Sequence, residues 1–218
     1  MIRVALVDDH AVVRAGYRAL LVSQPDLGVV GEFGDAGSAY RELDARAVDV
    51  VVIDLGMPGA GALETIARLR QRDPRLRALV FSMHCRASYV HQAFAAGARG
   101  YVTKSSEPEV LLRAVRDVAA GKRFLSADVA QLLAFERFGD ARGALDSLTV
   151  REFEVLRLLL AGREVDDIAS ALKLSPKTVR NLHYIVKRKL GVRDDIELVR
   201  LALRLDVVDL LDLGDEAG

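Results

Sequence analysis

The residues best suited to chemistry stand at the ends of short apolar runs. The segment VDVVVI, residues 48–53, is apolar at five of its six positions and is followed directly by Asp54. A carboxylate is rarely buried without a partner, so something near Asp54 is expected to need its negative charge. Similar apolar runs elsewhere in the chain end on other polar residues, namely Asp8, Asp9, Ser82 and Lys104.

Carboxylates, a hydroxyl and an ammonium group together can handle a phosphoryl group. Three clustered carboxylates repel one another unless a cation joins them, and Mg²⁺, which takes oxygen ligands, suits such a site. An aspartate can accept a phosphoryl group as an acyl phosphate, while a metal ion, a lysine and a hydroxyl balance the charge on the transferring oxygens. We predict Asp54 as the acceptor because it ends the middle strand in sequence order and precedes a flexible turn.

The elements that must position these residues alternate along residues 1 to about 120. Segments with helical spacing, the first marked by Val12, Ala15, Ala19 and Leu20, separate short β-branched runs. This alternation is typical of βαβ units and predicts an α/β domain with a five-stranded, doubly wound parallel sheet. The functional crevice of such a sheet lies beyond the carboxyl ends of its strands, where the polar residues would meet. The predicted strands are 2–7, 29–33, 48–53, 78–81 and 100–103.

Composition narrows the class of protein. The chain has 218 residues, 51% hydrophobic and 28% charged, which is typical of a soluble globular protein with two domains. The single cysteine, Cys85, excludes an intrachain disulfide and a CxxC-type metal framework. The N-terminus lacks the features of a signal peptide, and no run approaches the roughly 18 apolar residues of a membrane span. We therefore expect a cytoplasmic protein without a membrane partner.

The character of the sequence changes after the α/β region. We predict an α/β domain over residues 1–121, a linker with a short helix over 122–147, an all-α domain over 148–206 and an acidic, fraying tail over 207–218. The linker helix is expected to begin after Ser126, and Gly121 is expected to end the helix before it. In the all-α domain, the sequences TVRE from Thr149, SP from Ser175 and DD from Asp194 predict helix starts, and Gly162 predicts a helix end.

One helix of the all-α domain carries a local basic patch in a chain of zero net charge. Residues 173–193 include seven lysines and arginines and no acidic residue, a pattern that favours contact with the phosphate backbone. Apolar residues at helical spacing, including Val179 and Val186, mark the face that packs inward. A solvated charged face is the ordinary alternative, but exposed Asn and Tyr side chains among cations favour base reading by a helix-turn-helix. The predicted DNA-binding residues are Lys177, Thr178, Arg180, Asn181, Tyr184, Lys187 and Arg188.

The motifs LVDDH, IDLGMPG, FS and GYVTK, in this order and spacing, resemble the receiver domain of bacterial two-component response regulators. The resemblance implies phosphorylation of Asp54 by a partner sensor histidine kinase. It also implies a Mg²⁺ ion bound by Asp54 together with Asp8, Asp9 and the Gly56 carbonyl. Ser82 and Lys104 are then expected to contact the phosphate, and Tyr101 is expected to be the aromatic residue whose rotamer changes with the position of Ser82. Ala62 and Ser105 depart from the common family pattern, which has Gly at the first position and often an acidic residue at the second.

The segments LTVREFEVLRLLLAG, IASALKLSPKTV and KRKLGV resemble the LuxR-type helix-turn-helix. The two resemblances together identify the chain as a member of the NarL/FixJ group of response regulators, nearest to its GacA/UvrY branch. Leu182 departs from the His that is common in the group, so a different target sequence is expected. The group implies binding to promoter DNA and a homodimer when phosphorylated, with dimer contacts from the last helix, 196–205. Packing of that helix within its own domain is an equally good account.

Two other functions remain as alternatives. A phosphohydrolase with Asp54 as nucleophile needs a second carboxylate two residues later, where this chain has Gly56, so we predict that the protein is not an enzyme. A constitutive DNA-binding protein with a receiver used only as a scaffold is compatible with the sequence. His10, His84 and Cys85 near the crevice suggest a transition metal, but they lack ligand spacing.

Overall fold

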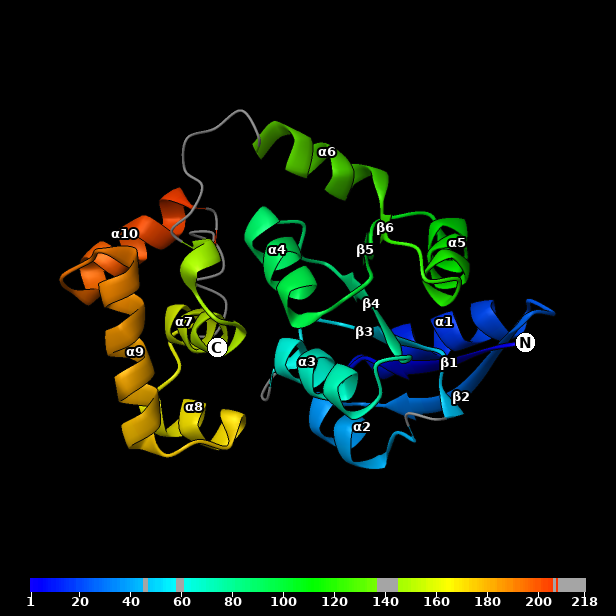
Figure 1. The fold of residues 1–218 in the computed structure, drawn as a ribbon, viewed down its shortest axis with the longest axis horizontal. Coiled ribbons are helices and arrows are strands. Elements are labelled where there is room, and N and C mark those ends of the chain that lie inside the picture. Colours follow the sequence, from blue (N-terminus) through cyan, green and yellow to red (C-terminus); the bar gives the residue numbers. More distant parts are fainter. Residues whose placement is uncertain (45–46, 58–60, 137–144, 206, 208–218) are drawn as a thin grey trace.

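The computed structural model describes residues 1–44, 47–57, 61–136, 145–205 and 207. In this part of the chain a parallel sheet and its helices form the first domain, and helices alone form the second (Figure 1). The sheet has the order β2-β1-β3-β4-β5-β6, in which every neighbouring pair is parallel. Its strands are β1 (Ile2–Val7), β2 (Leu27–Phe33), β3 (Val50–Ile53), β4 (Arg77–Ser82), β5 (Gly100–Thr103) and β6 (Phe124–Leu125).

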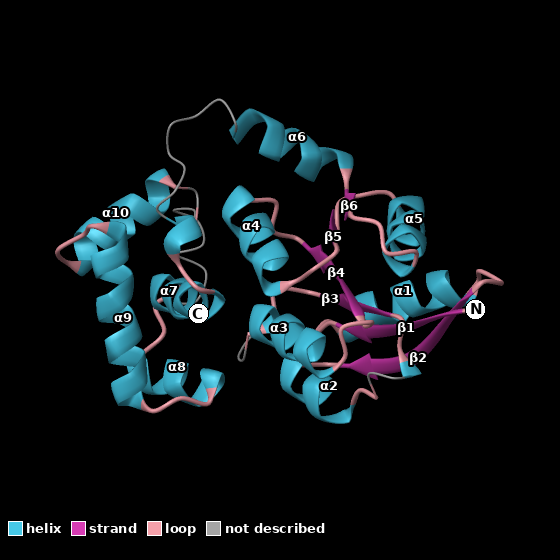
Figure 2. Cartoon of the chain, in the orientation of Figure 1, coloured by secondary structure: helices cyan, strands magenta, loops and turns pink. Residues whose placement is uncertain are grey.

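Helices cover both faces of the sheet (Figure 2). Alternate residues of the central strands point to opposite faces, so Val4, Val52 and Phe81 pack towards α1 and α5. Val51, Val80 and Tyr101 pack instead on the opposite side, in the core that includes residues of α2, α3 and α4. This arrangement confirms the predicted doubly wound α/β domain. The helices are α1 (Ala11–Val22), α2 (Ala36–Glu42), α3 (Ala62–Arg72), α4 (Ala87–Ala96) and α5 (Pro108–Ala119).

The buried face of the first helix differs from the one expected. Val12 is 87% exposed, and Ala15 and Ala19 are exposed as well. The side chains that pack on the sheet are Tyr17, Leu20 and Leu21, with Leu21 fully buried. The helix was predicted correctly, but small apolar residues are tolerated on both of its faces, so their spacing did not show which face packs.

The linker contributes to the first domain. β6 extends the sheet beyond the five predicted strands by pairing with Gly100 and Tyr101 of β5. A helix, α6 (Ala127–Glu136), begins directly after Ser126 as predicted and packs near α4 and β5. Gly121, with a φ of 85°, lies just beyond α5. The rest of the predicted linker up to residue 144 lies outside the described residues, and so does almost all of the predicted acidic tail.

The second domain has the helices and caps that the sequence predicts. The capping box of Thr149 and Glu152 opens α7, and the Ser175 and Asp194 side chains cap α9 and α10. Gly162 follows α7 with a φ of 74°. Between α8 and α9 the chain turns at Lys173, which has a left-handed φ of 53°. The elements are a short 3₁₀ helix η2 (Leu145–Ser147), α7 (Val150–Leu160), α8 (Val165–Leu172), α9 (Pro176–Leu190) and α10 (Asp195–Arg204).

The two domains share one hydrophobic cluster. Phe153 and Leu156 of α7 belong to the same buried cluster as Tyr89 and Val90 of α4. A separate, smaller core holds α7, α8 and α9 together. Figure 1 shows α7 on the side of the second domain that faces α3 and α4. Within the described residues, none of the helices is long and apolar enough to cross a membrane.

Candidate functional site

Three of the predicted residues meet at the carboxyl edge of the sheet. The Nζ atom of Lys104, just after β5, lies 2.7 Å from Oδ2 of Asp54 and 2.7 Å from Oδ2 of Asp8. Asp54 follows β3 and Asp8 follows β1, and these strands are neighbours in the sheet. The side chains of all three are at least nine-tenths buried. The strand ends therefore bring together charges that lie up to 96 residues apart in the sequence.

The electrostatics of this trio favour a charged lysine. Burial lowers the pKa of Lys104, but hydrogen bonds to Asp54 and Asp8 outweigh it, and the net pKa is raised. The Gly56 N–H donates to Oδ1 of Asp54 over 2.9 Å, so the two oxygens of Asp54 have different partners. Asp54 is thus held in one orientation by two donors. The proposed metal contact of the Gly56 carbonyl stays a prediction.

The acidic cluster fits a hard divalent cation. Asp8, Asp9, His10 and Asp54 each offer a ligand atom, and these atoms lie within 4.8 Å of one another. Lys104 supplies one positive charge beside the three carboxylates of Asp8, Asp9 and Asp54. The remaining negative charge could be neutralised by a divalent cation. Because most of these ligand atoms are carboxylate oxygens, the cluster matches the preference of Mg²⁺.

Of the three residues that suggest a transition metal, only His10 belongs to this cluster. Its Nδ1 lies 3.0 Å from Asp9 and 3.4 Å from Asp8, and its side chain is largely exposed. The ring of His84 stacks on Tyr89, and the sulfur of Cys85 lies 3.9 Å from Asp128. Among the described residues, the nitrogen ligand of this cluster, His10, lies at the rim of an oxygen-rich site.

Ser82 and Tyr101 lie behind the acidic cluster and are fully buried. The Ser82 hydroxyl accepts a hydrogen bond from the His84 N–H over 3.3 Å. The Tyr101 hydroxyl donates to the His84 carbonyl over 2.7 Å, so the ring points inward. Burial raises the pKa of Tyr101 far above its ordinary value, with the Ser82 hydroxyl acting in the opposite direction, so the phenol stays neutral. Tyr101 is thus next to Ser82, as its predicted switch role requires.

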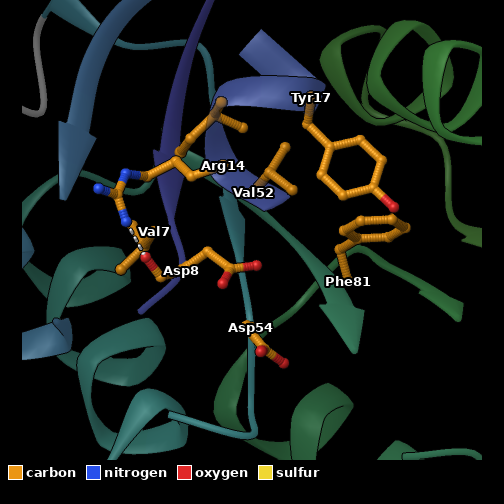
Figure 3. A pocket seen from close by; sticks show the side chains of 8 residues that line it. Val7, Asp8, Arg14, Tyr17, Val52, Asp54 and Phe81 are labelled. Atoms are coloured by element: carbon orange, nitrogen blue, oxygen red, sulfur yellow. Dashed lines mark hydrogen bonds between the residues drawn. The ribbon is translucent and has the colours of Figure 1, made fainter. Parts of the chain in front are cut away.

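Sequence reasoning missed one wall of the site, formed by Arg14, Tyr17 and Phe81. Figure 3 shows these side chains around a small cavity of about 10 Å³ that Asp8 and Asp54 also line. The rings of Tyr17 and Phe81 meet edge to face with centroids 4.5 Å apart, and Arg14 Nη1 donates to the Asp8 carbonyl over 2.5 Å. Arg14 and Tyr17 are three residues apart and so share a helix face, which was the available signal.

The predicted DNA-binding residues gather on the outer surface of α9. Val179 and Val186 are fully buried on the opposite side, as the apolar spacing predicts. Tyr184 is 58% exposed, and the Arg188 guanidinium lies 6.0 Å from the centre of its ring. Five of the predicted side chains besides Tyr184 are exposed: Lys177, Thr178, Arg180, Asn181 and Arg188.

Two of these predicted residues already have partners within the domain. The Nζ atom of Lys187 donates to Asp195 Oδ1 over 2.9 Å, and Lys187 is only partly exposed. The Thr178 hydroxyl lies 2.8 Å from the Ser175 hydroxyl, and its N–H donates to the same group over 3.1 Å. Thr178 is therefore part of the helix cap as well as a surface residue. Sequence alone gave no sign that Asp195, on the next helix, holds Lys187.

The last helix packs within its own domain, as one of the two expectations has it, and its role in dimer contact stays a prediction. Leu198 and Ala202 of α10 are buried against their own domain. Leu201 and Leu203 are partly exposed and line an open hollow with Leu190. Internal packing therefore uses one side of α10 and leaves apolar surface on another.

Comparisons with known proteins match both domains. Residues 4–116 match the family described as response regulator receiver domain, and residues 146–202 match bacterial regulatory proteins of the luxR family. The chain is 41% identical to the transcriptional regulatory protein UhpA of Escherichia coli (strain K12), over 92% of this chain and 97% of that protein. It is 37% identical to the response regulator GacA of Pseudomonas aeruginosa, over 96% and 99%.

A similar structure covers the same two domains. RcsB from Salmonella enterica serovar Typhimurium, bound to a promoter in the presence of phosphomimetic BeF₃⁻, superposes with a TM-score of 0.72. The sequences are 29% identical, and the match covers 95% of this chain and 99% of RcsB. The predicted order, an α/β receiver followed by an all-helical DNA-binding domain, is confirmed.

Proposed function

Because the chain belongs to the response regulators that join a receiver domain to a LuxR-type DNA-binding domain, we propose that phosphorylation of Asp54 by a partner sensor histidine kinase controls its binding to promoter DNA. The observation that carries this proposal is the shared contact of Lys104 with Asp54 and Asp8 in a buried site. The RcsB structure, which contains both promoter DNA and a phosphomimetic, supports the same pairing of functions. We place the protein in the cytoplasm, where both partners would be found.

The residues of the site suit phosphoryl transfer to Asp54. One Asp54 oxygen attacks the phosphorus, the bond from phosphorus to the donor's histidine nitrogen breaks, and that nitrogen keeps the electron pair. Lys104, which donates to Asp54 Oδ2, would donate to a phosphoryl oxygen, and so would the Ser82 hydroxyl. Tyr101 beside Ser82 would sense that contact.

The acidic residues have a second role, as the metal site. Asp8, Asp9 and Asp54, with the Gly56 carbonyl, would hold Mg²⁺. When bound, the ion supplies positive charge that offsets the negative charge of the phosphoryl oxygens. Asp8 would then exchange part of its contact with Lys104 for the metal, which frees the ammonium group for the phosphoryl group.

The second domain would read DNA through α9. Arg180, Asn181 and Tyr184 are exposed and offer donors and acceptors for base edges. Lys177 and Arg188, with Thr178 and Lys187, would contact phosphates. The half-exposed apolar surface of α10 supports a homodimer of the phosphorylated protein. The protein acts here as a switch and not as an enzyme, because Gly56 provides no general acid beside Asp54.

Incubation with Mg²⁺ and a small phosphodonor tests the proposal. The intact protein should gain one phosphoryl group by mass spectrometry, and the group should be lost in alkali, as an acyl phosphate is. Asp54→Asn should gain none, whereas Asp128→Asn, a control that removes a carboxylate outside the acidic cluster, should be labelled like the wild type. Labelling of Asp54→Asn at the wild-type rate would overturn the assignment.

A further inference from the structure

The second domain contacts the receiver through an aromatic residue of α7. The ring of Phe153, which is fully buried, meets the ring of Tyr89 on α4 edge to face with centroids 5.5 Å apart. Beside it, Nε2 of Gln92 on α4 donates to the carbonyls of Leu145 and Leu148, over 3.3 and 3.4 Å. Phe153 therefore belongs to the DNA-binding domain by sequence but completes its burial on the receiver.

Polar contacts fix the other end of the same interface. Glu154, also buried, accepts a hydrogen bond from the Glu64 N–H at the start of α3 over 3.1 Å. Arg151 pairs with both Glu64 and Glu154. The Glu154 carboxylate occupies the space above Gly61, where a Cβ atom would collide with it. The second domain is thus held at two points, on α3 and on α4.

The aromatic contact continues to the phosphorylation site through His84. The His84 ring stacks on Tyr89, with centroids 4.7 Å apart and planes 12° from parallel. Its N–H donates to Ser82 and its carbonyl accepts from Tyr101. His84 therefore touches the interface with its ring and both proposed switch residues with its backbone. Two ring contacts and one backbone hydrogen bond therefore separate Phe153 from Ser82.

Docking in this arrangement leaves the DNA-reading residues exposed. α7 faces the receiver, and α9 lies on the far side of α7 from the receiver (Figure 1). Arg180 and Tyr184 of α9 are exposed. A receiver that covered these side chains would prevent their base contacts directly, and the receiver does not cover them in this arrangement. The docked state is therefore compatible with DNA binding, and the aromatic contact gives it a physical link to the phosphorylation site.

We propose that docking of α7 on α3 and α4 is the DNA-competent arrangement, and that the Phe153–Tyr89–His84 contact couples it positively to phosphorylation of Asp54. Ser82 can accept from the His84 N–H and still donate its own proton to a phosphoryl oxygen, so the two contacts do not compete. Tyr101 is already inward in the docked state. The inference rests on the proposed function and adds that docking and phosphorylation of Asp54 favour each other. Because coupling between sites is reciprocal, loosening Phe153 must weaken binding of a phosphoryl mimic to the other domain.

The test titrates beryllofluoride with Mg²⁺ onto the full-length protein and follows bound fluoride by ¹⁹F NMR. Phe153→Leu keeps an apolar side chain but removes the ring contact, and Tyr89→Leu removes the same contact from the receiver side. Each should raise the beryllofluoride concentration for half-saturation about fivefold or more, the lower end of usual coupling. Phe124→Leu in β6, the same substitution away from this contact, should have no effect.

The double variant Phe153→Leu with Tyr89→Leu sharpens the result. If the two rings act through one contact, the double variant should be no weaker than Tyr89→Leu alone. Tyr89→Leu also keeps the test valid if Phe153→Leu fails to fold by circular dichroism. The proposal would be overturned if folded variants reached half-saturation at the same beryllofluoride concentration as the wild type. It would also be overturned if they bound beryllofluoride more tightly, because docking would then oppose phosphorylation. Wild-type protein that does not bind the mimic, with Asp54→Asn behaving identically, would instead refute the function on which the proposal rests.

Discussion

Two lysine–aspartate pairs of nearly equal length, one in each domain, differ in burial and therefore in role. Lys104 lies 2.7 Å from Asp54, with side chains 7% and 5% exposed. Lys187 lies 2.9 Å from Asp195, with side chains 24% and 67% exposed. Water screens the second pair but hardly reaches the first. A buried pair is costly to break and so fixes a site, whereas an exposed pair can open when a phosphate offers a better partner.

The largest effect is expected from Lys104→Met. Loss of the ammonium group leaves Asp8 and Asp54 buried without their partner, which should lower the free energy of unfolding by about 3–5 kcal/mol in the presence of a chelator. Mg²⁺ should restore part of that loss, because it replaces the missing positive charge. Urea denaturation measures both. Lys122→Met, which breaks an exposed pair with Asp117, should cost less than about 1 kcal/mol, and an equal loss in both variants would contradict the contrast.

Substitutions in α9 should affect recognition more than stability. Arg180→Ala or Tyr184→Ala should weaken binding to a preferred duplex, selected by the protein from random DNA, by about 1–3 kcal/mol relative to a scrambled duplex. The reason is that base contacts exist only on the preferred sequence. Fluorescence anisotropy at several salt concentrations measures both affinities. Lys187→Ala is the comparison: it should weaken both duplexes and lower the salt slope by about one. Equal losses on both duplexes from all three substitutions would mean that α9 only follows the backbone.

The buried Glu154 should make stability depend on pH. Burial raises the pKa of Glu154, partly offset by the Glu64 N–H and by Arg151. A carboxyl with a raised pKa in the folded state stabilises the protein below its unfolded pKa, and this contribution is lost as pH rises through the folded pKa. Compared with Glu154→Gln, the wild type should therefore lose stability as pH rises above 4.5, the ordinary pKa of a glutamate. Urea denaturation at several pH values measures the free energy of unfolding of both proteins. A difference between them that stays constant over this pH range would contradict the raised pKa of Glu154.

The smallest effect is expected from Asp195→Asn. It removes the cost of opening this pair when Lys187 contacts a phosphate, so affinity for nonspecific duplex DNA should rise a few-fold while the salt slope stays about the same. Stability should change by less than about 1 kcal/mol, because the pair is exposed. Glu197→Gln removes the same charge from α10 but leaves Lys187 paired. An equal gain from Glu197→Gln would show that only net charge matters, and not release of Lys187.

The sequence predicted the contacts that follow from regular secondary structure, and it did not predict most contacts between side chains of different elements. Asp8, Asp54 and Lys104 were predicted to meet because parallel strands bring their carboxyl ends to one edge, whatever the details of packing. The division of α9 into a buried and an exposed face followed from helical spacing alone. The sequence did not show which side chains of different elements pair, as Tyr17 does with Phe81 and Asp195 with Lys187. The contact of Phe153 with Tyr89 joins residues of two domains, and no periodicity within either domain records it.

Control of DNA binding by Asp54 is tested most directly by the affinity of the full-length protein for its preferred duplex, with and without beryllofluoride and Mg²⁺. We predict tighter binding with the mimic at several protein concentrations, and no change for Asp54→Asn, which lacks the carboxylate that the mimic needs. Equal wild-type affinity with and without the mimic would contradict the account and favour a constitutive DNA-binding protein with the receiver as a scaffold.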